Sequence, residues 1–278
     1  MFAQRDAVIR LLGDEDEETI RLVKEQLRHQ AVEHPADFVE FAQQVDGVAR
    51  RHIQDILDQL QRQEAEGDFD LYCRFFDDAA DVEPALWVLA HALRPGLDLA
   101  PYREKISQWG RRLAIRLAGA VSNRERVLVL GDFMAGELCF RGNTGAYYHE
   151  RNSLVPCVMD TRMGIPLSLT LLYRMVALRA GMLVDGINLP GHFIARHEGV
   201  LFDPFHKGRI LTRKDCEFIL LRQNLRLKNC HLLPATPRQI LTRTLLNLLH
   251  VYIISGNCAQ TGLIESWLTA LGGVLARG

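Results

Sequence analysis

Residues 162–208 read RMGIPLSLTLLYRMVALRAGMLVDGINLPGHFIARHEGVLFDPFHKG, and this stretch decides the fold. Pro166 suits the first turn of a helix, because its missing N–H would be unpaired there anyway. The residues that follow are apolar on nearly every side, which is typical of a buried helix. Gly181 is a natural C-terminal stop. The stretch therefore predicts a buried helix from Pro166 to about residue 180.

Three short strand candidates follow this helix. They lie at residues 183–189, 192–196 and 200–203, and the last two are separated by a tight turn at 197–199. Spacings this short favour antiparallel neighbours joined by hairpins. We expect a small antiparallel meander packed against the helix.

Two side chains in this meander carry chemistry. His192 and Asp203 fall on neighbouring strands, beside the N-terminus of the predicted helix. A catalytic thiol needs an imidazole to take its proton and a carboxylate to fix the imidazole tautomer. His192 and Asp203 fit these two roles, so the stretch holds the skeleton of a thiol-type site.

Five spaced motifs link this region to a known family. They are Phe140 with Gly142-Asn143, then Asn152-Ser153, GIPLSL at 164–169, PGHF at 190–193 and DPF at 203–205. Residues 85–219 resemble the transglutaminase-like superfamily of papain-type thiol folds. More narrowly, they resemble its bacterial SirB-type branch, which joins a transglutaminase-like domain to tetratricopeptide repeats. The resemblance implies an α+β fold, in which a central helix packs on a small antiparallel sheet between helical extensions.

The nucleophile of that family has no counterpart at the expected position. Counting back from Gly181, the position where the superfamily carries its Cys falls at about Pro166. Ser168, in the first turn, is one substitute, although its hydroxyl could instead bond locally to the helix start. Cys157 is another, although a thiol there could simply be a small core residue. Without a nucleophile, His192 is interpreted as a structural residue bonded to Asp203.

The overall composition is that of an ordinary folded protein. The chain has 278 residues, a net charge of −1, 48% hydrophobic residues and 24% charged residues. No stretch of about twenty apolar residues could span a bilayer, and the N-terminus does not read as a signal peptide. The six cysteines stand singly, without the spacing of a zinc site or a disulfide framework. We expect reduced thiols, a cytoplasmic location, no cofactor and no bound metal.

Charge is unevenly distributed along the chain. The first seventy residues are rich in acid, and the tract from Lys207 to Arg243 is rich in base. This split is compatible with two solvated faces or with a basic face for an acidic partner. The basic tract lacks interleaved aromatic residues and any nucleic-acid-binding motif, which argues against nucleic acid as the partner.

The pattern divides the chain into three regions. Residues 1–66 form a helical N-terminal region, 67–233 the transglutaminase-like domain and 234–278 a tetratricopeptide-like helical pair, with linkers at 64–70 and 234–238. In the last region, Leu248, Tyr252 and Gly256 match a tetratricopeptide-like helix pair in spacing. The match is partial, because Leu249 stands where that repeat prefers Gly and Gly273 where it prefers Pro. One such pair cannot bury its own apolar faces, so it must dock on the core or on another chain.

Two functional hypotheses remain open. The first is a non-catalytic transglutaminase-like protein, a pseudoenzyme that acts as a protein-interaction or regulatory scaffold with a protein partner. The second is an acyl-transfer enzyme or an amide or ester hydrolase that uses His192 and Asp203 with Ser168 or Cys157 as nucleophile. Because Pro166 lacks a nucleophilic atom, we favour the first. The oligomeric state is left open.

Overall fold

The computed structural model describes residues 5–272, and these form a mostly helical α+β protein. The chain divides into two compact units. One takes in the chain up to Asp68 together with Ala92–Gly96, and the other takes in Phe69–His91 and the chain from Leu97 onward. No helix among the described residues is both long enough and apolar enough to cross a bilayer.

The N-terminal part of the first unit, up to Asp68, contains helices and no strand among its described residues. They are α1 (Arg5–Leu12), α2 (Glu17–Glu33), α3 (Pro35–Gln43) and the first part of α4 (Gly47–Arg74). Their apolar faces meet in a core that includes Leu12, Leu27, Phe38 and Ile53. Asp16 caps α2 through the N–H of Thr19, and Pro35 occupies the first turn of α3. The helical prediction for this region is confirmed.

Residues 64–70, which the sequence suggests as a linker, lie inside α4 in helical conformation. Gly67 is exposed and a methyl group there would meet no atom within 4 Å, so nothing about its surroundings requires glycine. Ala65 and Phe69 on the same helix are buried. Because these apolar residues recur at helical spacing, burial keeps the helix continuous through an acidic, glycine-containing segment.

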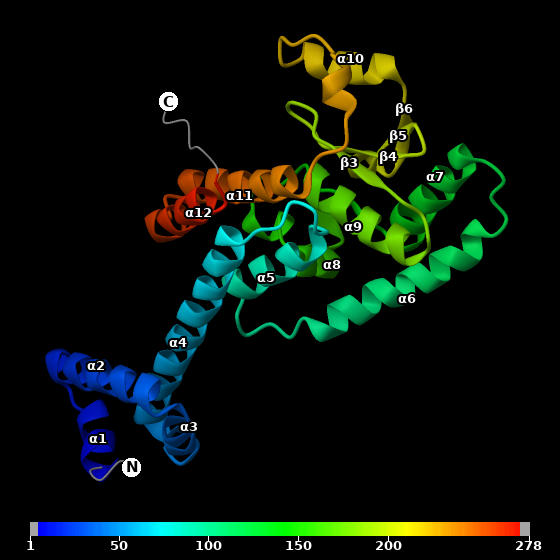
Figure 1. Ribbon diagram of the computed structural model, residues 1–278. Helices are drawn as coiled ribbons and strands as arrows, with labels where there is room; N and C mark the ends of the chain where they lie inside the picture. Colours follow the sequence, from blue (N-terminus) through cyan, green and yellow to red (C-terminus); the bar gives the residue numbers. More distant parts are fainter. Residues whose placement is uncertain (1–4, 273–278) are drawn as a thin grey trace. The chain divides into compact units, whose positions relative to one another are not determined.

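The second unit contains the remaining helices and all the strands (Figure 1). Its helices are α5 (Glu83–Leu93), α6 (Ala100–Leu117), α7 (Asn123–Gly131), α8 (Val155–Thr161), α9 (Pro166–Arg179), α10 (Arg213–Leu221), α11 (Pro237–Ile254) and α12 (Cys258–Ala270). A π-helical turn at Asp132–Glu137 extends α7. Short 3-10 turns occupy Glu150–Asn152, Pro204–His206 and Asn229–Leu232.

The main sheet is antiparallel and has the order β3 (Asp185–Ile187), β4 (Ile194–His197), β5 (Val200–Asp203) and β6 (Arg209–Leu211). Its first three strands confirm the predicted meander. The fourth was not predicted, because three residues after a charged turn show no alternation of apolar and polar side chains. Two short segments, β1 (Arg141–Gly142) and β2 (Met163–Gly164), pair in parallel elsewhere.

Helix α9 is the centre of this unit and lies between the sheet and α6 (Figure 1). Pro166 is its first residue, and Gly181 just beyond its end has φ +74°, as the sequence predicts. Nearly all of its side chains are buried. A methyl group on Gly110 of α6 would lie 2.2 Å from Cβ of Arg179, so the two helices touch at backbone distance.

Helices α11 and α12 pack against each other as the predicted pair, with a turn at Gly256 (φ +69°). The region predicted for the pair extends to residue 278, and its last six positions, 273–278, lie outside the described residues. The segment before the pair is attached to the sheet edge. Pro234 forms a bridge with Ile187, and the N–H of Ala235 donates to the Gly186 carbonyl at 2.8 Å.

Candidate functional site

Strand pairing brings the predicted His and Asp together. His192 lies just before β4, after the left-handed Gly191 (φ +77°), and Asp203 is the last residue of β5. In the β4–β5 hairpin Ala195 pairs with Phe202, so the start of β4 lies beside the end of β5. The site is therefore formed at one end of this hairpin.

A second histidine joins the pair. Nε2 of His192 and Nδ1 of His206 each lie 2.7 Å from the same oxygen, Oδ2 of Asp203. The other oxygen, Oδ1, accepts from the backbone N–H groups of Phe205 at 2.9 Å and of His206 at 3.3 Å. These bonds fix the orientation of the carboxylate. We call His192, Asp203 and His206 the His-Asp-His cluster.

The carboxylate of Asp203 is held in its ionised form. Its side chain is 3% exposed, and this burial by itself raises the pKa, but the hydrogen bonds and charges of His192 and His206 outweigh burial and hold the pKa below its usual value. Because an ionised carboxylate can only accept, each imidazole presents an N–H to it. This leaves Nδ1 of His192 as the nitrogen that could act as a base.

Both candidate substitute nucleophiles, Ser168 and Cys157, are buried. The hydroxyl of Ser168 is buried, accepts from the N–H of Ile165 at 3.1 Å and lies 2.5 Å from the carbonyl oxygen of Asn152. This is the local bonding that the sequence offers as the alternative to catalysis. Cys157 is buried in α8. Pro166 begins α9, where the resemblance places the family's Cys.

The upstream motif residues build a loop beside the cluster. Asn143 donates through Nδ2 to Oδ1 of Asn152 at 3.0 Å, and Asn152 donates to the carbonyl oxygens of Ala146 at 2.6 Å and Tyr147 at 2.9 Å. A methyl group on Gly142 would lie 2.5 Å from the ring of Phe205. These residues therefore position the loop and the Phe205 ring.

The aromatic ring of Phe205 lies beside the cluster. The ring of Phe205 lies 6.3 Å from that of His192, 6.3 Å from Tyr147 and 5.2 Å from His206, measured between centroids. His206 was missed as a site residue in the sequence. The signal available was its spacing, three residues after Asp203, across a turn that begins with Pro204.

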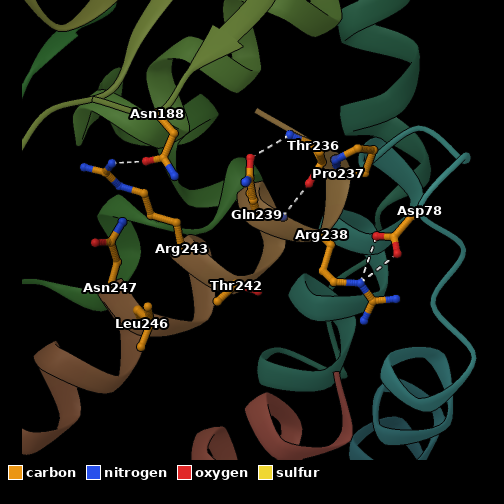
Figure 2. Close-up of a pocket in the computed structure, with 10 residues that line it drawn as sticks. All are labelled: Asp78, Asn188, Thr236, Pro237, Arg238, Gln239, Thr242, Arg243, Leu246 and Asn247. Atoms are coloured by element: carbon orange, nitrogen blue, oxygen red, sulfur yellow. Dashed lines mark hydrogen bonds and ion pairs between the residues drawn. The ribbon is translucent and has the colours of Figure 1, made fainter. Parts of the chain in front are cut away.

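A separate cavity of about 900 Å³ lies along α11. Figure 2 shows the residues that line it. Arg238 points to one end, where it pairs with Asp78 at 2.8 Å, and Arg243 points to the other. The guanidinium of Arg243 donates to the Leu189 carbonyl at 2.9 Å and to Asn188, and burial lowers its pKa. No carboxylate in the described part of the chain pairs with Arg243.

Two other basic residues have carboxylate partners. Arg196 pairs with Asp185 at 2.8 Å, and Arg209 pairs with Asp215 at 2.8 Å. The Arg209–Asp215 pair is exposed and the Arg196–Asp185 pair is partly exposed, and ion pairs in contact with solvent contribute little to stability. They also leave these two residues less suited than Arg243 to bind an anion.

Sequence comparisons relate this chain to several known proteins. A UPF0162 protein of Pseudomonas aeruginosa is 31% identical over 191 residues, which cover 67% of this chain and 70% of that protein. A UPF0162 protein of Xylella fastidiosa (strain 9a5c) is 34% identical over 142 residues, or 46% of this chain. F-box only protein 21 of Mus musculus is 36% identical over 96 residues, or 30% of this chain.

The chain spans 49% of the length of the Xylella protein and 15% of the mouse protein. No solved structure matches it. A family model described as the transglutaminase-like superfamily matches residues 100–246, more than half of the chain. The match includes α9, the four-stranded sheet and the His-Asp-His cluster. The chain therefore belongs to the transglutaminase-like superfamily and is homologous to the UPF0162 proteins.

Proposed function

We propose that this protein is a non-catalytic, SirB-type member of the superfamily that acts as a protein-interaction or regulatory scaffold. The observation that carries the proposal is Pro166 at the first position of α9, where the family resemblance places the nucleophilic Cys. Proline has no side-chain atom that can attack a carbonyl. The commitment of the Ser168 hydroxyl to backbone groups supports the same conclusion.

The His192–Asp203 bond has a structural use that needs no catalysis. It links the turn before β4 to the end of β5, and Asp203 also caps the 3-10 turn at Pro204–His206. Hydrogen bonds to a charged group contribute about 1.5–3 kcal/mol to stability. The His192–Asp203 pair can therefore stabilise the fold of a domain that lacks a nucleophile.

The cavity along α11 is our proposed contact site for the partner. Arg243 offers a positive charge that no described carboxylate neutralises, and Leu246 on the same wall is 44% exposed. Ile253 and Ile254, further along α11, are also exposed. Together they suit a protein segment that combines a carboxylate with an apolar side chain. The basic tract that ends at Arg243 supports an acidic partner.

Catalysis is tested with purified protein and fluorogenic thioester, ester and amide substrates, with and without an amine acceptor. We expect wild type and His192→Ala to give the same rate as buffer alone. Turnover by wild type that disappears in His192→Ala would overturn the proposal. It would support the alternative, an acyl-transfer enzyme or hydrolase in which Asp203 orients His192 and leaves its Nδ1 available as a base.

Binding is tested by fluorescence anisotropy with a labelled peptide that alternates Glu and Leu, and with a Gln-Leu peptide as the neutral control. We expect wild type to bind only the acidic peptide, and more weakly as salt increases. Leu246→Glu places a negative charge at an exposed position of the cavity and should abolish binding. Leu128→Glu, which makes the same change at an exposed leucine of α7 outside the basic tract and the cavity lining, should not. Equal loss in both variants, or no binding by wild type, would contradict the proposed contact site.

A further inference from the structure

We propose that the His-Asp-His cluster binds a divalent transition-metal ion of the zinc class. The ligands are Nε2 of His192, Oδ2 of Asp203 and Nδ1 of His206, which all lie within 4.8 Å of one another. Cysteine spacing, the only metal-site pattern considered in the sequence, does not reveal this set, because it contains no cysteine. The inference does not rest on the proposed scaffold function, because a metal ion can be bound with or without catalysis.

The geometry is close to that of a bound site. Each imidazole nitrogen lies 2.7 Å from Oδ2 of Asp203. In a tetrahedral site with ligands at about 2.0–2.1 Å, neighbouring ligand atoms are separated by about 3.3 Å. To bind an ion, each imidazole nitrogen must therefore move about half an ångström away from Oδ2 of Asp203. The two imidazole nitrogens must also move toward each other. His206 is 61% exposed, so its ring has room to make this adjustment.

Further hydrogen bonds hold the proposed carboxylate ligand in place. Oδ1 of Asp203 is held by two backbone N–H groups, which aims Oδ2 at the two imidazoles. Such outer contacts orient the ligands of metal sites and sharpen their affinity. The side chain of Asp203 is 3% exposed and that of His192 is 12% exposed, so one side of the ion would be shielded from water.

The donor set determines the class of ion. Two imidazoles with one carboxylate suit Zn²⁺, Co²⁺ or Fe²⁺, whereas Mg²⁺ and Ca²⁺ prefer oxygen ligands. Three protein ligands leave a fourth position for water or for a donor atom of a partner. Each coordinating nitrogen must lose its proton, so affinity should fall as the pH falls.

The test uses the full chain, stripped with a chelator and titrated with Co²⁺ while visible absorption is recorded. We expect saturation at one ion per chain with the absorption of a low-coordinate site, and reversal by one equivalent of Zn²⁺. Absence of saturable binding would overturn the proposal. Weak binding of several ions per chain, as expected of separate exposed histidines, would also overturn it.

His206→Asn is the decisive variant, because its amide can still donate to Asp203 while the imidazole is lost. Its Co²⁺ affinity should fall by more than the roughly 10- to 100-fold that is typical of altering an outer contact. His29→Asn, at an exposed histidine on α2, is the matched control and should bind as wild type does. Thermal unfolding in chelator should be similar for wild type and both variants. Unchanged affinity in His206→Asn would refute the site.

Discussion

Nε2 of His192 lies 2.7 Å from Oδ2 of Asp203, although the two residues are eleven positions apart in the chain. The hairpin of β4 and β5 creates this proximity, and backbone N–H groups of the following turn hold the second oxygen of the same carboxylate. The buried side chain of Asp203 thus links the end of β5, the following turn and the imidazole of His192. Replacing Asp203 should therefore lower the stability of the fold, whether or not the site is catalytic.

Asp203→Asn should lower the free energy of unfolding at pH 7 by about 2–4 kcal/mol. The variant removes the charge that accepts from two imidazoles and places an amide group in a buried site, and loss of such bonds is costly. Urea denaturation measures the difference. A loss below about 0.5 kcal/mol would show that the cluster does not stabilise the fold.

The stabilising effect of Asp203 should disappear in acid. Its pKa in the folded protein is below its usual value, so near and below the unfolded pKa of about 3.9 the unfolded chain binds a proton that the native chain does not. The advantage of wild type over Asp203→Asn should therefore be complete above about pH 5 and shrink as the pH falls past 4. Denaturation curves at stepped pH values measure it, and a difference that grows in acid would contradict the assignment.

Tyr173→Phe should leave stability unchanged or raise it by up to about 1 kcal/mol. The hydroxyl of Tyr173 is buried in α9 without a hydrogen-bond partner among residues 5–272, and burial together with the charge of Asp203 raises its pKa. Above about pH 10 the unfolded chain loses the phenolic proton that the native chain keeps, so wild type should lose stability there relative to the variant. Thermal unfolding at pH 7 and pH 10.5 tests both statements. A clear loss at pH 7 would indicate a bonding partner of this hydroxyl.

Ser168→Ala should cost about 1–3 kcal/mol, because the Ile165 N–H and the Asn152 carbonyl lose a buried partner. Thr170→Val is the matched control on the same helix. The Thr170 hydroxyl is buried and has no partner in the described structure, so its replacement by a methyl group should be neutral or stabilising. The two variants compared by chemical denaturation should change stability in opposite directions or by clearly different amounts.

Two glycine substitutions should act in opposite directions. Gly67→Ala lies at an open position inside α4 and should raise helix stability by about 0.5–1 kcal/mol. Gly110→Ala would force a methyl group to 2.2 Å from Cβ of Arg179 and should cost about 1–3 kcal/mol. Calorimetric unfolding measures both. Destabilisation by Gly67→Ala would argue that residues 64–70 are not helical.

Local pattern was enough to predict the middle of the second unit. Pro166 and Gly181 mark the ends of α9 because one lacks an N–H and the other has φ +74°, and the apolar run between them can only be buried. Three of the four strands were predicted because their segments are short and are separated by tight turns. The motifs around His192 and Asp203 predicted the superfamily, which the match over residues 100–246 confirms.

The sequence alone therefore determined the family, the central helix, the meander and the closeness of His192 and Asp203. Tertiary structure decided what those side chains meet. It places Nδ1 of His206 beside the same oxygen of Asp203 that His192 contacts. It also places the Ser168 hydroxyl beside the carbonyl oxygen of Asn152, and it pairs Arg243 with no carboxylate among the described residues. Helix ends and strand alternation depend on neighbours in the chain, whereas these contacts depend on which distant segments pack together, and spacing along the chain does not specify that.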